Sequence, residues 1–278
     1  MSSESSIAKH YTKGNLLERL LSTLRDDGLE LEQASVETLA PYDQFHGRGL
    51  EATKELADAL SVSDKDHILD IGSGIGGPAR YIADRFGCRV SGIDLTEEFC
   101  AVANHLTNSL GLENRVTFDQ GNALDLPFGA NSFDGAYSMN VSMNIADKAG
   151  FYAEIIRVLR PGAWLALSEI AQGPGGTLDY PTPWARTADA SFLATPQETR
   201  DGLSAAGFTD IHLRDTKEET LAFNARAKAM VERGGKPPQR AVKLIHGELA
   251  KAAAANTSRG YADSAILPIE VFCRKPDR

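Results

Sequence analysis

The sequence predicts a doubly wound α/β fold, in which parallel strands are joined by crossover helices. Three observations support this class. From His67 onward, short apolar runs alternate with amphipathic stretches, which is the pattern of β-α units. A glycine-rich segment, Gly72–Gly77, follows the first apolar run. The chain has 278 residues, of which 42% are hydrophobic and 24% charged, so it is long enough and apolar enough to bury a sizeable core.

The N-terminal residues 1–46 are expected to be helical and irregular. Leucines at helical spacing give this segment one apolar face: Leu16, Leu17, Leu20, Leu21 and Leu24. Gly47-Arg48-Gly49 precedes a second expected helix at 50–60. The alternating region then predicts strands at 67–71, 89–95, 116–120, 133–139 and 164–169, with helices at 79–86, 97–110 and 147–159. Arg160-Pro161-Gly162 is expected to end the last of these helices.

The C-terminal third predicts a loop, two late strands and a helical insert. Residues 173–186 are rich in Gly and Pro, and Thr195 is the expected N-cap of a helix at 196–207. Strands are expected at 211–214 and 269–274. These patterns divide the chain into four expected parts: an N-terminal helical cap (1–60), an α/β core (61–220), a helical lid insert (221–262) and the last strand of the core (263–278).

Composition excludes several classes of function. The formal net charge of −9 argues against a nucleic-acid partner, because binding to polyphosphate needs clustered Lys and Arg. Three widely spaced cysteines and six histidines show no metal-ligand spacing, so no metal is expected. The polar N-terminus lacks the apolar core of a signal peptide, and no apolar run approaches about 18 residues. We therefore expect a cytoplasmic protein that acts on a small molecule away from membranes.

The glycine-rich segment is compatible with two kinds of cofactor. Gly72, Gly74 and Gly77 satisfy the GxGxxG pattern, and Asp94 lies 22 residues after Gly72, where a carboxylate can bind a ribose. Asp70 separates the two interpretations. A carboxylate beside the turn would repel the pyrophosphate of a dinucleotide, but it would favour the ammonium and sulfonium of S-adenosylmethionine. The alternative is that Asp70 caps N–H groups of the turn.

Five segments in order resemble the motifs of class I S-adenosylmethionine-dependent methyltransferases. They are the acidic glycine turn 70–77, Gly92-Ile93-Asp94-Leu95, the adenine loop 121–128, the fourth-strand segment 131–138 and the turn 157–162. A nicotinamide dehydrogenase would not be expected to carry the last three. The resemblance implies a seven-stranded Rossmann-like sheet. It also implies binding of S-adenosylmethionine, and of the product S-adenosylhomocysteine, by Asp70, Gly72, Gly74, Gly76, Asp94, Leu95, Asn122, Ala123 and Ser138.

A narrower resemblance links the chain to the sarcosine/dimethylglycine N-methyltransferase group. It rests on the segments 41–49 (PYDQFHGRG), 74–80 (GIGGPAR) and 143–148 (MNIADK). It implies an amino-acid-like amine as acceptor. The chain departs from the group at 138–142 (SMNVS), where relatives often carry an aromatic residue or Gln followed by His. The alternatives are O- or C-methylation of a small natural-product-like molecule, or a catalytically silent protein that binds S-adenosylmethionine and acts through partners.

Methyl transfer is an in-line displacement whose leaving group is neutral, so the protein mainly has to align the reactants. His46 is a candidate base or substrate contact because an unperturbed pKa near 6.5 suits neutral pH. Asn140 follows the fourth strand, where parallel sheets bind ligands. The candidate substrate contacts are Tyr11, Tyr42, Gln44 and Trp184. Each of these has a structural alternative: a backbone bond for His46, a turn cap for Asn140, and packing for the others.

Overall fold

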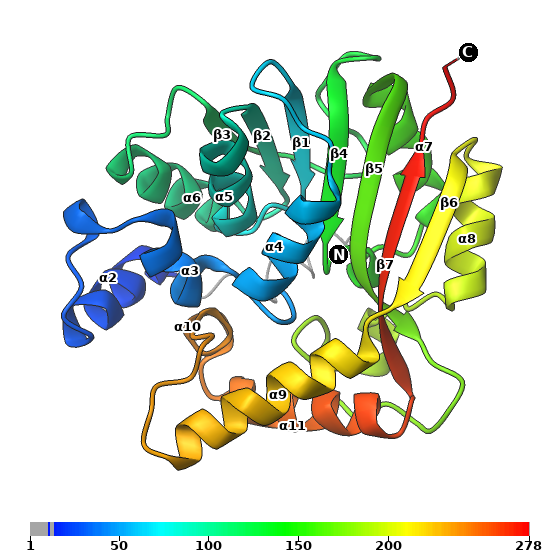
Figure 1. Cartoon of the computed structure of the whole chain (residues 1–278). Coiled ribbons are helices and arrows are strands. Elements are labelled where there is room, and N and C mark those ends of the chain that lie inside the picture. Colours follow the sequence, from blue (N-terminus) through cyan, green and yellow to red (C-terminus); the bar gives the residue numbers. More distant parts are fainter. Residues whose placement is uncertain (1–10, 12–13, 278) are drawn as a thin grey trace. The chain divides into compact units, whose positions relative to one another are not determined.

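The computed structural model describes Tyr11 and residues 14–277. Its strands form one seven-stranded sheet in the order β3-β2-β1-β4-β5-β7-β6 (Figure 1). The predicted α/β class with seven strands is therefore confirmed. The strands are β1 (His67–Ile71), β2 (Arg89–Asp94), β3 (Val116–Gln120), β4 (Phe133–Met139), β5 (Leu159–Gln172), β6 (Thr209–Asp215) and β7 (Ile266–Arg274).

The last strand departs from the parallel arrangement. The pairs β1–β2, β2–β3 and β4–β5 are parallel, whereas β7 lies antiparallel between β5 and β6. Asp215 at the end of β6 pairs with Ile269 near the start of β7, so the chain re-enters the sheet at the end where it left. A strand that returns at the same end must run in the opposite direction. The sheet is consequently mixed.

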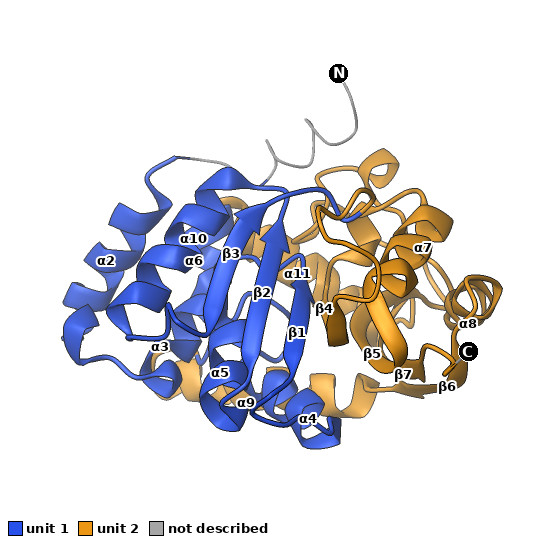
Figure 2. Cartoon of the chain, turned by 90° about the horizontal axis from the view of Figure 1, so that it is seen from above, with its two compact units in different colours: residues 1–123, 238–247 blue, residues 124–237, 248–278 orange. Residues whose placement is uncertain are grey.

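The chain forms two compact units (Figure 2). Unit 1 comprises residues 1–123 and 238–247, and unit 2 comprises residues 124–237 and 248–278. The division into cap, core, lid and last strand stays a prediction. Unit 1 contains β1–β3 with α2 (Leu16–Asp26), η1 (Leu31–Gln33), α3 (Val36–Asp43), α4 (Leu50–Ala59), α5 (Gly77–Phe86), α6 (Glu97–Ser109) and α10 (Ala241–His246).

The leucine periodicity near the N-terminus forms the apolar face of α2, as predicted. Leu16, Leu20 and Leu24 are buried, and Leu17 and Leu21 pack against the same cluster. The cluster also contains Phe99, Val102 and Leu106 of α6. Burial of these side chains, rather than helix propensity, supplies most of the stability of such a short helix.

Unit 2 contains the other four strands and four α-helices. The helices are α7 (Lys148–Val158), α8 (Pro196–Ala205), α9 (Lys217–Glu232) and α11 (Leu249–Ala262), with short 3-10 turns η2 (Ser142–Asn144) and η3 (Ala188–Ala190). Thr195 is the N-cap of α8, as predicted. Its hydroxyl accepts from the Glu198 N–H at 3.1 Å, and the Glu198 carboxylate accepts from the Thr195 N–H at 2.8 Å. Both partners of this capping box are therefore satisfied.

The helix α7 ends before Arg160-Pro161-Gly162, as predicted. This segment does not form a loop, however, because it belongs to the next strand. α7 ends at Val158, and β5 begins at Leu159 instead of the predicted Trp164. Leu159 pairs with Phe133, and Trp164 pairs with Gly135, so β5 carries extra residues between these two pairs. The additional residues form an irregularity that includes Gly162 at a φ of +75°. The sequence pattern could not distinguish this bulged strand from a loop.

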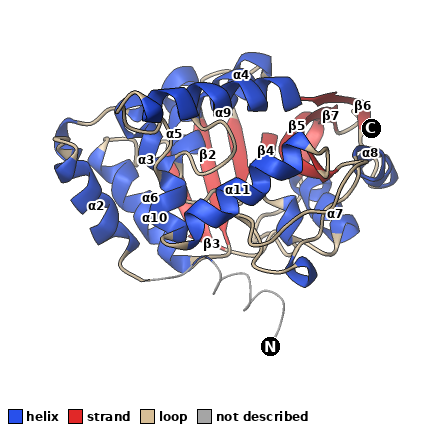
Figure 3. Ribbon diagram, turned by 90° about the horizontal axis from the view of Figure 1, so that it is seen from below, coloured by secondary structure: helices blue, strands red, loops and turns tan. Residues whose placement is uncertain are grey.

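The late insert is mostly helical, as predicted. Residues 217–262 contain α9, α10 and α11, joined by irregular segments (Figure 3). Its role as a lid stays a prediction. Within the described part of the chain, no helix combines the length and the apolar character that a membrane span requires.

Candidate active site

The turn between β1 and α5 depends on glycines in a left-handed conformation. Gly72, Gly74 and Gly76 have φ angles of +74°, +55° and +83°. Other residues occupy this region only at a cost, because their Cβ approaches the backbone. The N–H groups of Gly72 and Ser73 donate to the Ile93 carbonyl at 2.8 and 3.0 Å. These bonds fasten the turn to β2.

The same turn is crowded on one side and open on the other. A Cβ at Gly76 would lie 2.4 Å from the Phe118 ring, whereas a Cβ at Gly74 would meet nothing within 4 Å. The Ser73 hydroxyl is buried and has no hydrogen-bond partner among the described residues. Asp70 is buried near the end of β1. The turn therefore offers room and polar groups to a ligand that approaches at Gly74.

Asp94 closes the turn from the end of β2. Its carboxylate accepts from the Gly74 N–H at 2.8 Å and from the Thr96 N–H at 2.9 Å. Burial raises its pKa, while the bonds from Thr96 and Gly74 act in the opposite direction. Each carboxylate oxygen has more than one acceptor site, so Asp94 can still accept bonds from the hydroxyls of a ribose.

The predicted adenine loop begins beside Asp94. The Gly121 N–H donates to the Asp94 carbonyl at 2.9 Å, and Asn122 and Ala123 follow in half-buried positions. The Leu95 carbonyl accepts from Gln120 at 3.1 Å. Unit 1 thus brings together eight of the nine predicted donor contacts: Asp70, Gly72, Gly74, Gly76, Asp94, Leu95, Asn122 and Ala123. The ninth, Ser138, is buried on β4 in unit 2.

His46 lies in a closed and buried network, which changes its expected chemistry. Its Nε2 lies 3.0 Å from both Gln44 Oε1 and Thr53 Oγ1, and its Nδ1 lies 3.1 Å from the Gly47 carbonyl oxygen. Burial lowers the pKa of His46 to about 4, although the bond to Gly47 acts in the opposite direction. This corrects the expectation of a pKa near neutrality. At pH 7 the ring is neutral and a weak base, and its contact with a substrate stays a prediction.

Gln44 has an unused donor in the same network. Its side chain is fully buried, and Oε1 accepts from Thr53 Oγ1 at 2.7 Å. Its Nε2 has no partner among the described residues. The Gln239 amide donates to the backbone carbonyls of Gln44 and His46 at 3.2 and 2.7 Å, which fixes the segment. A buried amide N–H without a partner is costly, so a ligand at this position would be stabilised.

Tyr42 and Tyr11 are engaged in packing within unit 1. The Tyr42 hydroxyl donates to Asp27 at 2.5 Å, and the Arg240 guanidinium lies over the Tyr42 ring at 5.4 Å. Tyr11 contacts the rings of Phe45, Phe99 and His246 at centroid distances of 6.1, 5.9 and 6.0 Å. The packing alternative describes these contacts, and the binding roles of both tyrosines stay predictions.

An ion pair that sequence reasoning missed holds the glycine turn against α3. Arg80 is fully buried and donates to Asp43 Oδ2 at 2.9 Å and to the Ile75 carbonyl at 2.6 Å. Burial raises the pKa of Asp43, while the Arg80 charge lowers it. Removing one partner of a buried pair leaves the other charge uncompensated. The available signal was an arginine next to Ala79 on the buried face of a predicted helix.

The segment after β4 carries Asn140 in a left-handed conformation. Its φ is +58°, and its N–H donates to the Ser168 carbonyl at 2.7 Å. Asn tolerates this conformation better than most residues. Because ligands bind at the carboxyl ends of parallel strands, Asn140 lies where the sequence analysis placed it for an acceptor contact. The contact itself stays a prediction.

Glu169 is a second candidate at this edge of the sheet, and the sequence analysis missed it. It lies on β5, one residue beyond Ser168, and is 4% exposed. Both carboxylate oxygens accept from the Ser142 N–H, at 3.3 and 3.2 Å. Burial raises the pKa of Glu169 to about 7, against the lowering effects of Ser142 and the Lys148 charge. The available signal was a lone acidic residue in an apolar strand.

Trp184 packs inside unit 2. Its indole N–H donates to Ser191 Oγ at 2.8 Å, and its ring belongs to an apolar cluster with Met143, Ile170 and Tyr261. The packing alternative describes these contacts. A role in substrate binding stays a prediction.

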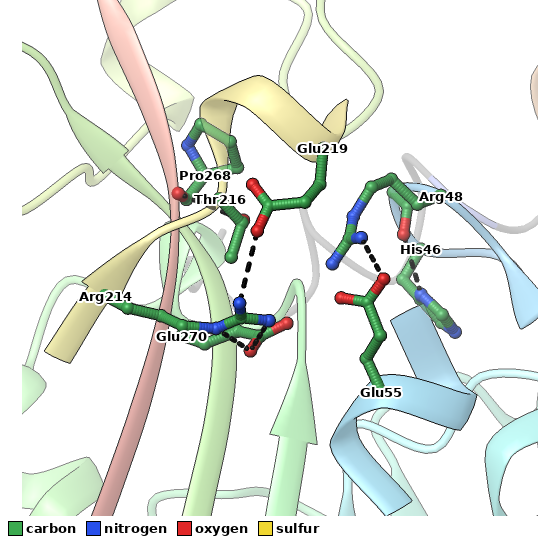
Figure 4. Close-up of polar contacts among 9 residues, drawn as sticks. His46, Arg48, Glu55, Arg214, Thr216, Glu219, Pro268 and Glu270 are labelled. Carbon is green, nitrogen blue, oxygen red and sulfur yellow. Dashed lines mark hydrogen bonds and ion pairs between the residues drawn. The ribbon is translucent and has the colours of Figure 1, made fainter. Parts of the chain in front are cut away.

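Two further groups of charged side chains form ion pairs (Figure 4). In unit 1, Arg48 donates to Glu55 at 2.8 Å. In unit 2, Arg214 makes two bonds of 2.8 Å to the buried Glu270 and one of 3.2 Å to Glu219. The described residues contain no group of His, Cys, Asp or Glu side chains that could hold a metal ion.

Residues 69–167 match the family model described as a methyltransferase domain. The match runs from β1 through the glycine turn and Asp94 to β5. The chain thus contains a region, residues 69–167, that is similar to methyltransferase domains. The cofactor of such domains is S-adenosylmethionine, which the acidic glycine turn already favoured over a dinucleotide.

Curated relatives of the methyltransferase domain differ in their acceptors. The chain is 33% identical to methyltransferase GfsG of Streptomyces halstedii over 174 residues, 62% of this chain and 60% of that protein. It is 29% identical to erythromycin 3''-O-methyltransferase of Saccharopolyspora erythraea over 184 residues, 62% and 60% of the two chains. It is 30% identical to phosphoethanolamine N-methyltransferase 1 of Arabidopsis thaliana over 203 residues, 69% of this chain and 40% of that protein. The matches thus span about 60% or less of the relatives' length.

Solved structures confirm the fold of the methyltransferase domain. The 4+2 cyclase SpnF has a TM-score of 0.70 at 21% identity, covering 99% of this chain and 97% of that chain. A putative sarcosine dimethylglycine methyltransferase from Galdieria sulphuraria has a TM-score of 0.68 at 19% identity, covering 82% and 86%. The narrower resemblance to the sarcosine group therefore has only a fold-level counterpart here.

The residues of the methyltransferase domain fit its cofactor. The open side of Gly74 leaves space where a ligand can approach, and the Ser73 hydroxyl is a buried polar group without a partner in the described chain. Asp94 retains acceptor capacity for ribose hydroxyls. The buried carboxylate of Asp70 suits a cationic ligand better than a pyrophosphate. When bound, S-adenosylmethionine supplies a methyl group activated by a sulfonium.

Proposed function

We propose that this chain transfers a methyl group from S-adenosylmethionine to a hydroxyl group of a small molecule. The observation that carries the choice of acceptor is Glu169, a buried carboxylate beside the segment that contains Asn140. Its pKa of about 7 matches that of a general base at neutral pH. Erythromycin 3''-O-methyltransferase, among the curated relatives, supports the same acceptor class.

The proposed step has a defined balance of bonds and protons. A bond forms between the acceptor oxygen and the methyl carbon, and the bond from that carbon to sulfur breaks. The hydroxyl proton passes to a carboxylate oxygen of Glu169. The sulfur leaves as a neutral thioether, so no acid is required. Asn140 orients the acceptor, and the domain contributes alignment of the two reactants.

A charged amine is a less favourable acceptor at this position. The ammonium of Lys148 already interacts with Glu169. A second cation nearby would be repelled, because like charges in a partly buried site interact strongly.

The amine acceptor stays as a second candidate because of specific sequence features. The segments 41–49 and 143–148 resemble the sarcosine/dimethylglycine group, and phosphoethanolamine N-methyltransferase 1 is a curated relative. A third candidate reaction is cyclisation, because the name of SpnF, a solved structure with a similar fold, describes a cyclase. A fold by itself does not decide between these chemistries.

The test is a panel of acceptors with a donor that carries a deuterated methyl group. Sugars, phenols and aliphatic alcohols represent hydroxyls, and sarcosine, dimethylglycine and phosphoethanolamine represent amines. Mass spectrometry should find the label on a hydroxyl compound. Label on an amine alone would overturn the acceptor class and leave the donor assignment intact.

The role of Glu169 is tested with Glu169→Gln. Because a general base contributes about 10²–10⁴-fold, kcat should fall by about 10² or more. In the wild type, kcat should rise as the pH passes through about 7, where Glu169 loses its proton. The exposed Glu113→Gln is the matched control. A Glu169→Gln variant with unchanged kcat would exclude the proposed base.

A further inference from the structure

Lys148 stands at an unfavourable position for a lysine. It is the first residue of α7, where the helix dipole places partial positive charge. Asp147 caps the helix by accepting from the Gly150 N–H at 2.8 Å. Lys148 is half-buried, and this burial lowers its pKa to about 8. Helix stability alone therefore does not explain a lysine here.

The ammonium makes three short bonds to backbone carbonyls. Lys148 Nζ donates to the carbonyl oxygens of Ser142 at 2.5 Å, Ile145 at 2.6 Å and Phe192 at 2.6 Å. A charged lysine has three donors, and all three are used. A neutral amine has two, so loss of the proton leaves one of these carbonyls without its partner.

The three carbonyls belong to two segments of unit 2. Ser142 is the first residue of the turn η2 and Ile145 follows its last, and the turn comes after Asn140. Phe192 lies next to Ser191, whose hydroxyl accepts from the Trp184 indole. The same two segments meet again where the Phe192 N–H donates to the Met143 carbonyl at 2.8 Å. Lys148 is therefore the charged group that joins the segment 140–147 to the segment 187–193.

Glu169 binds the first residue of the same turn. It accepts from the Ser142 N–H, while Lys148 binds carbonyls of Ser142 and Ile145. A carboxylate at exposed N–H groups and a cation at exposed carbonyls both complement the dipole of a helical turn. The two charges thus fix one short segment, Glu169 at Ser142 and Lys148 at both Ser142 and Ile145.

We propose that Lys148 is a positioning residue for the acceptor side of the reaction, whose ammonium fixes the segment after β4 to the segment that holds Trp184. The effect on the acceptor rests on the proposed function. The effect on the two segments does not rest on it. The joining of the segments and the proposed acceptor class can therefore be disproved independently.

Few ionisable groups accompany Lys148. Glu169 on β5 raises its pKa by charge, against burial. On α7, burial and the charge of Glu169 raise the pKa of Tyr152, which therefore stays neutral. Asp147 is engaged at the helix start, and Asp189 is the ionisable side chain between 187 and 193. Lys148 has a pKa of about 8, and Glu169, with a pKa of about 7, loses its proton at lower pH than Lys148.

The experiment is hydrogen exchange measured by mass spectrometry on Lys148→Met, Lys148→Arg and the exposed control Lys251→Met. Lys148→Met should lose protection in 140–147 and 187–193 by at least about tenfold, since bonds to a charged group contribute about that factor. Lys148→Arg keeps a charge and donors, so it should restore protection in part. Unchanged exchange in both segments of Lys148→Met would overturn the proposal.

The wild type supplies a second measurement if Lys148→Met does not fold. Hydrogen-exchange protection of the two segments should be lower at pH 9.5 than at pH 7, after correction for the intrinsic exchange rates. These two pH values lie about one unit or more on either side of the Lys148 pKa of about 8. The pKa in the folded chain lies below the ordinary 10.5. Titration of Lys148 therefore increases the free energy of unfolding as the pH rises from about 8 to 10.5. The expected loss of protection must then come from local opening of the two segments and not from global unfolding. A uniform change across the chain would overturn the proposal.

The acceptor itself provides the last readout. With a hydroxyl compound that turns over in the panel, Lys148→Met should raise KM for that compound by about tenfold or more, as expected for a displaced contact. The affinity for S-adenosylmethionine, measured by calorimetry, should stay within about twofold. Lys148→Arg should recover most of the KM. Equal losses of acceptor KM and donor affinity would indicate a general structural role and contradict positioning.

Discussion

His46 and Glu169 are both buried, and burial favours the neutral form of each. For His46 this lowers the pKa to about 4, so the ring carries no charge at pH 7. For Glu169 it raises the pKa to about 7, so both protonation states are populated near neutrality. A base works best when its pKa lies near the working pH. The geometry therefore moves the proposed base from the histidine to the carboxylate.

Asp94→Asn tests the proposed ribose contact. The substitution keeps the size of the side chain but removes the charge that strengthens the accepted bonds. A hydrogen bond to a charged group contributes about 1.5–3 kcal/mol, so the Kd for S-adenosylmethionine should rise at least about tenfold. Calorimetry measures this, with the exposed Asp84→Asn as control. Unchanged donor affinity in a folded variant would place the ribose elsewhere.

The depressed pKa of His46 predicts an acid-sensitive fold. Its pKa lies below the ordinary 6.5, so the unfolded chain binds a proton more readily between pH 6.5 and about 4. Stability from this group is present above pH 6.5 and is lost as the pH falls toward 4. The free energy of unfolding should therefore fall more steeply with acidification in the wild type than in His46→Asn. The exposed His105→Asn should follow the wild type, and parallel curves for all three would argue against a buried neutral His46.

Among single residues, the sequence predicted those whose proposed roles depend on neighbours in the chain. The glycines of the turn and Asp94 carry their roles in their spacing along the chain. Lys148 and Glu169 do not, because their roles depend on burial and on contacts with Ser142 and Phe192. Arg80 was missed for the same reason, since its partner Asp43 lies 37 residues away in the sequence.

The glycine turn permits a test at the scale of an element. Gly74 has a φ of +55° and open space beyond its Cα, and Gly111 has a φ of +67° and equally open space. Replacement by alanine should cost each about 1–2 kcal/mol of stability through the left-handed backbone. Gly74→Ala should in addition weaken donor binding, because its Cβ would occupy the approach to the turn.

The control Gly111→Ala should keep the donor affinity of the wild type, as measured by calorimetry on both variants. Chemical denaturation gives their stabilities. Equal donor affinity in the two variants would contradict the assignment of the Gly74 side to the ligand.

Elements were predicted well where one pattern dominates. The strands 67–71, 116–120 and 133–139 have the predicted bounds, because apolar runs define them. The direction of β7 was not predictable from periodicity, which carries no information on where the chain re-enters the sheet. The early start of β5 was hidden by Pro161 and Gly162, which usually mark a loop.

The whole chain combines a recognisable domain with an open choice of acceptor. The family match covers 69–167, which includes all the predicted cofactor residues. The segments outside it include His46, Trp184 and Glu169, which bear on the acceptor. Relatives named for O- and for N-methylation match 62% and 69% of this chain. Sequence therefore specifies the donor side better than the acceptor side, because most of the candidate acceptor residues lie outside the matched region.

The most direct test of the central claim is transfer of a deuterated methyl group by the purified chain. The account predicts labelled product among the hydroxyl compounds of the panel, with one S-adenosylhomocysteine formed for each methyl transferred. In Glu169→Gln the rate of labelling should fall by about 10² or more, with donor binding retained. A chain that binds S-adenosylmethionine but labels no compound in either class would contradict the account and favour a silent binding protein.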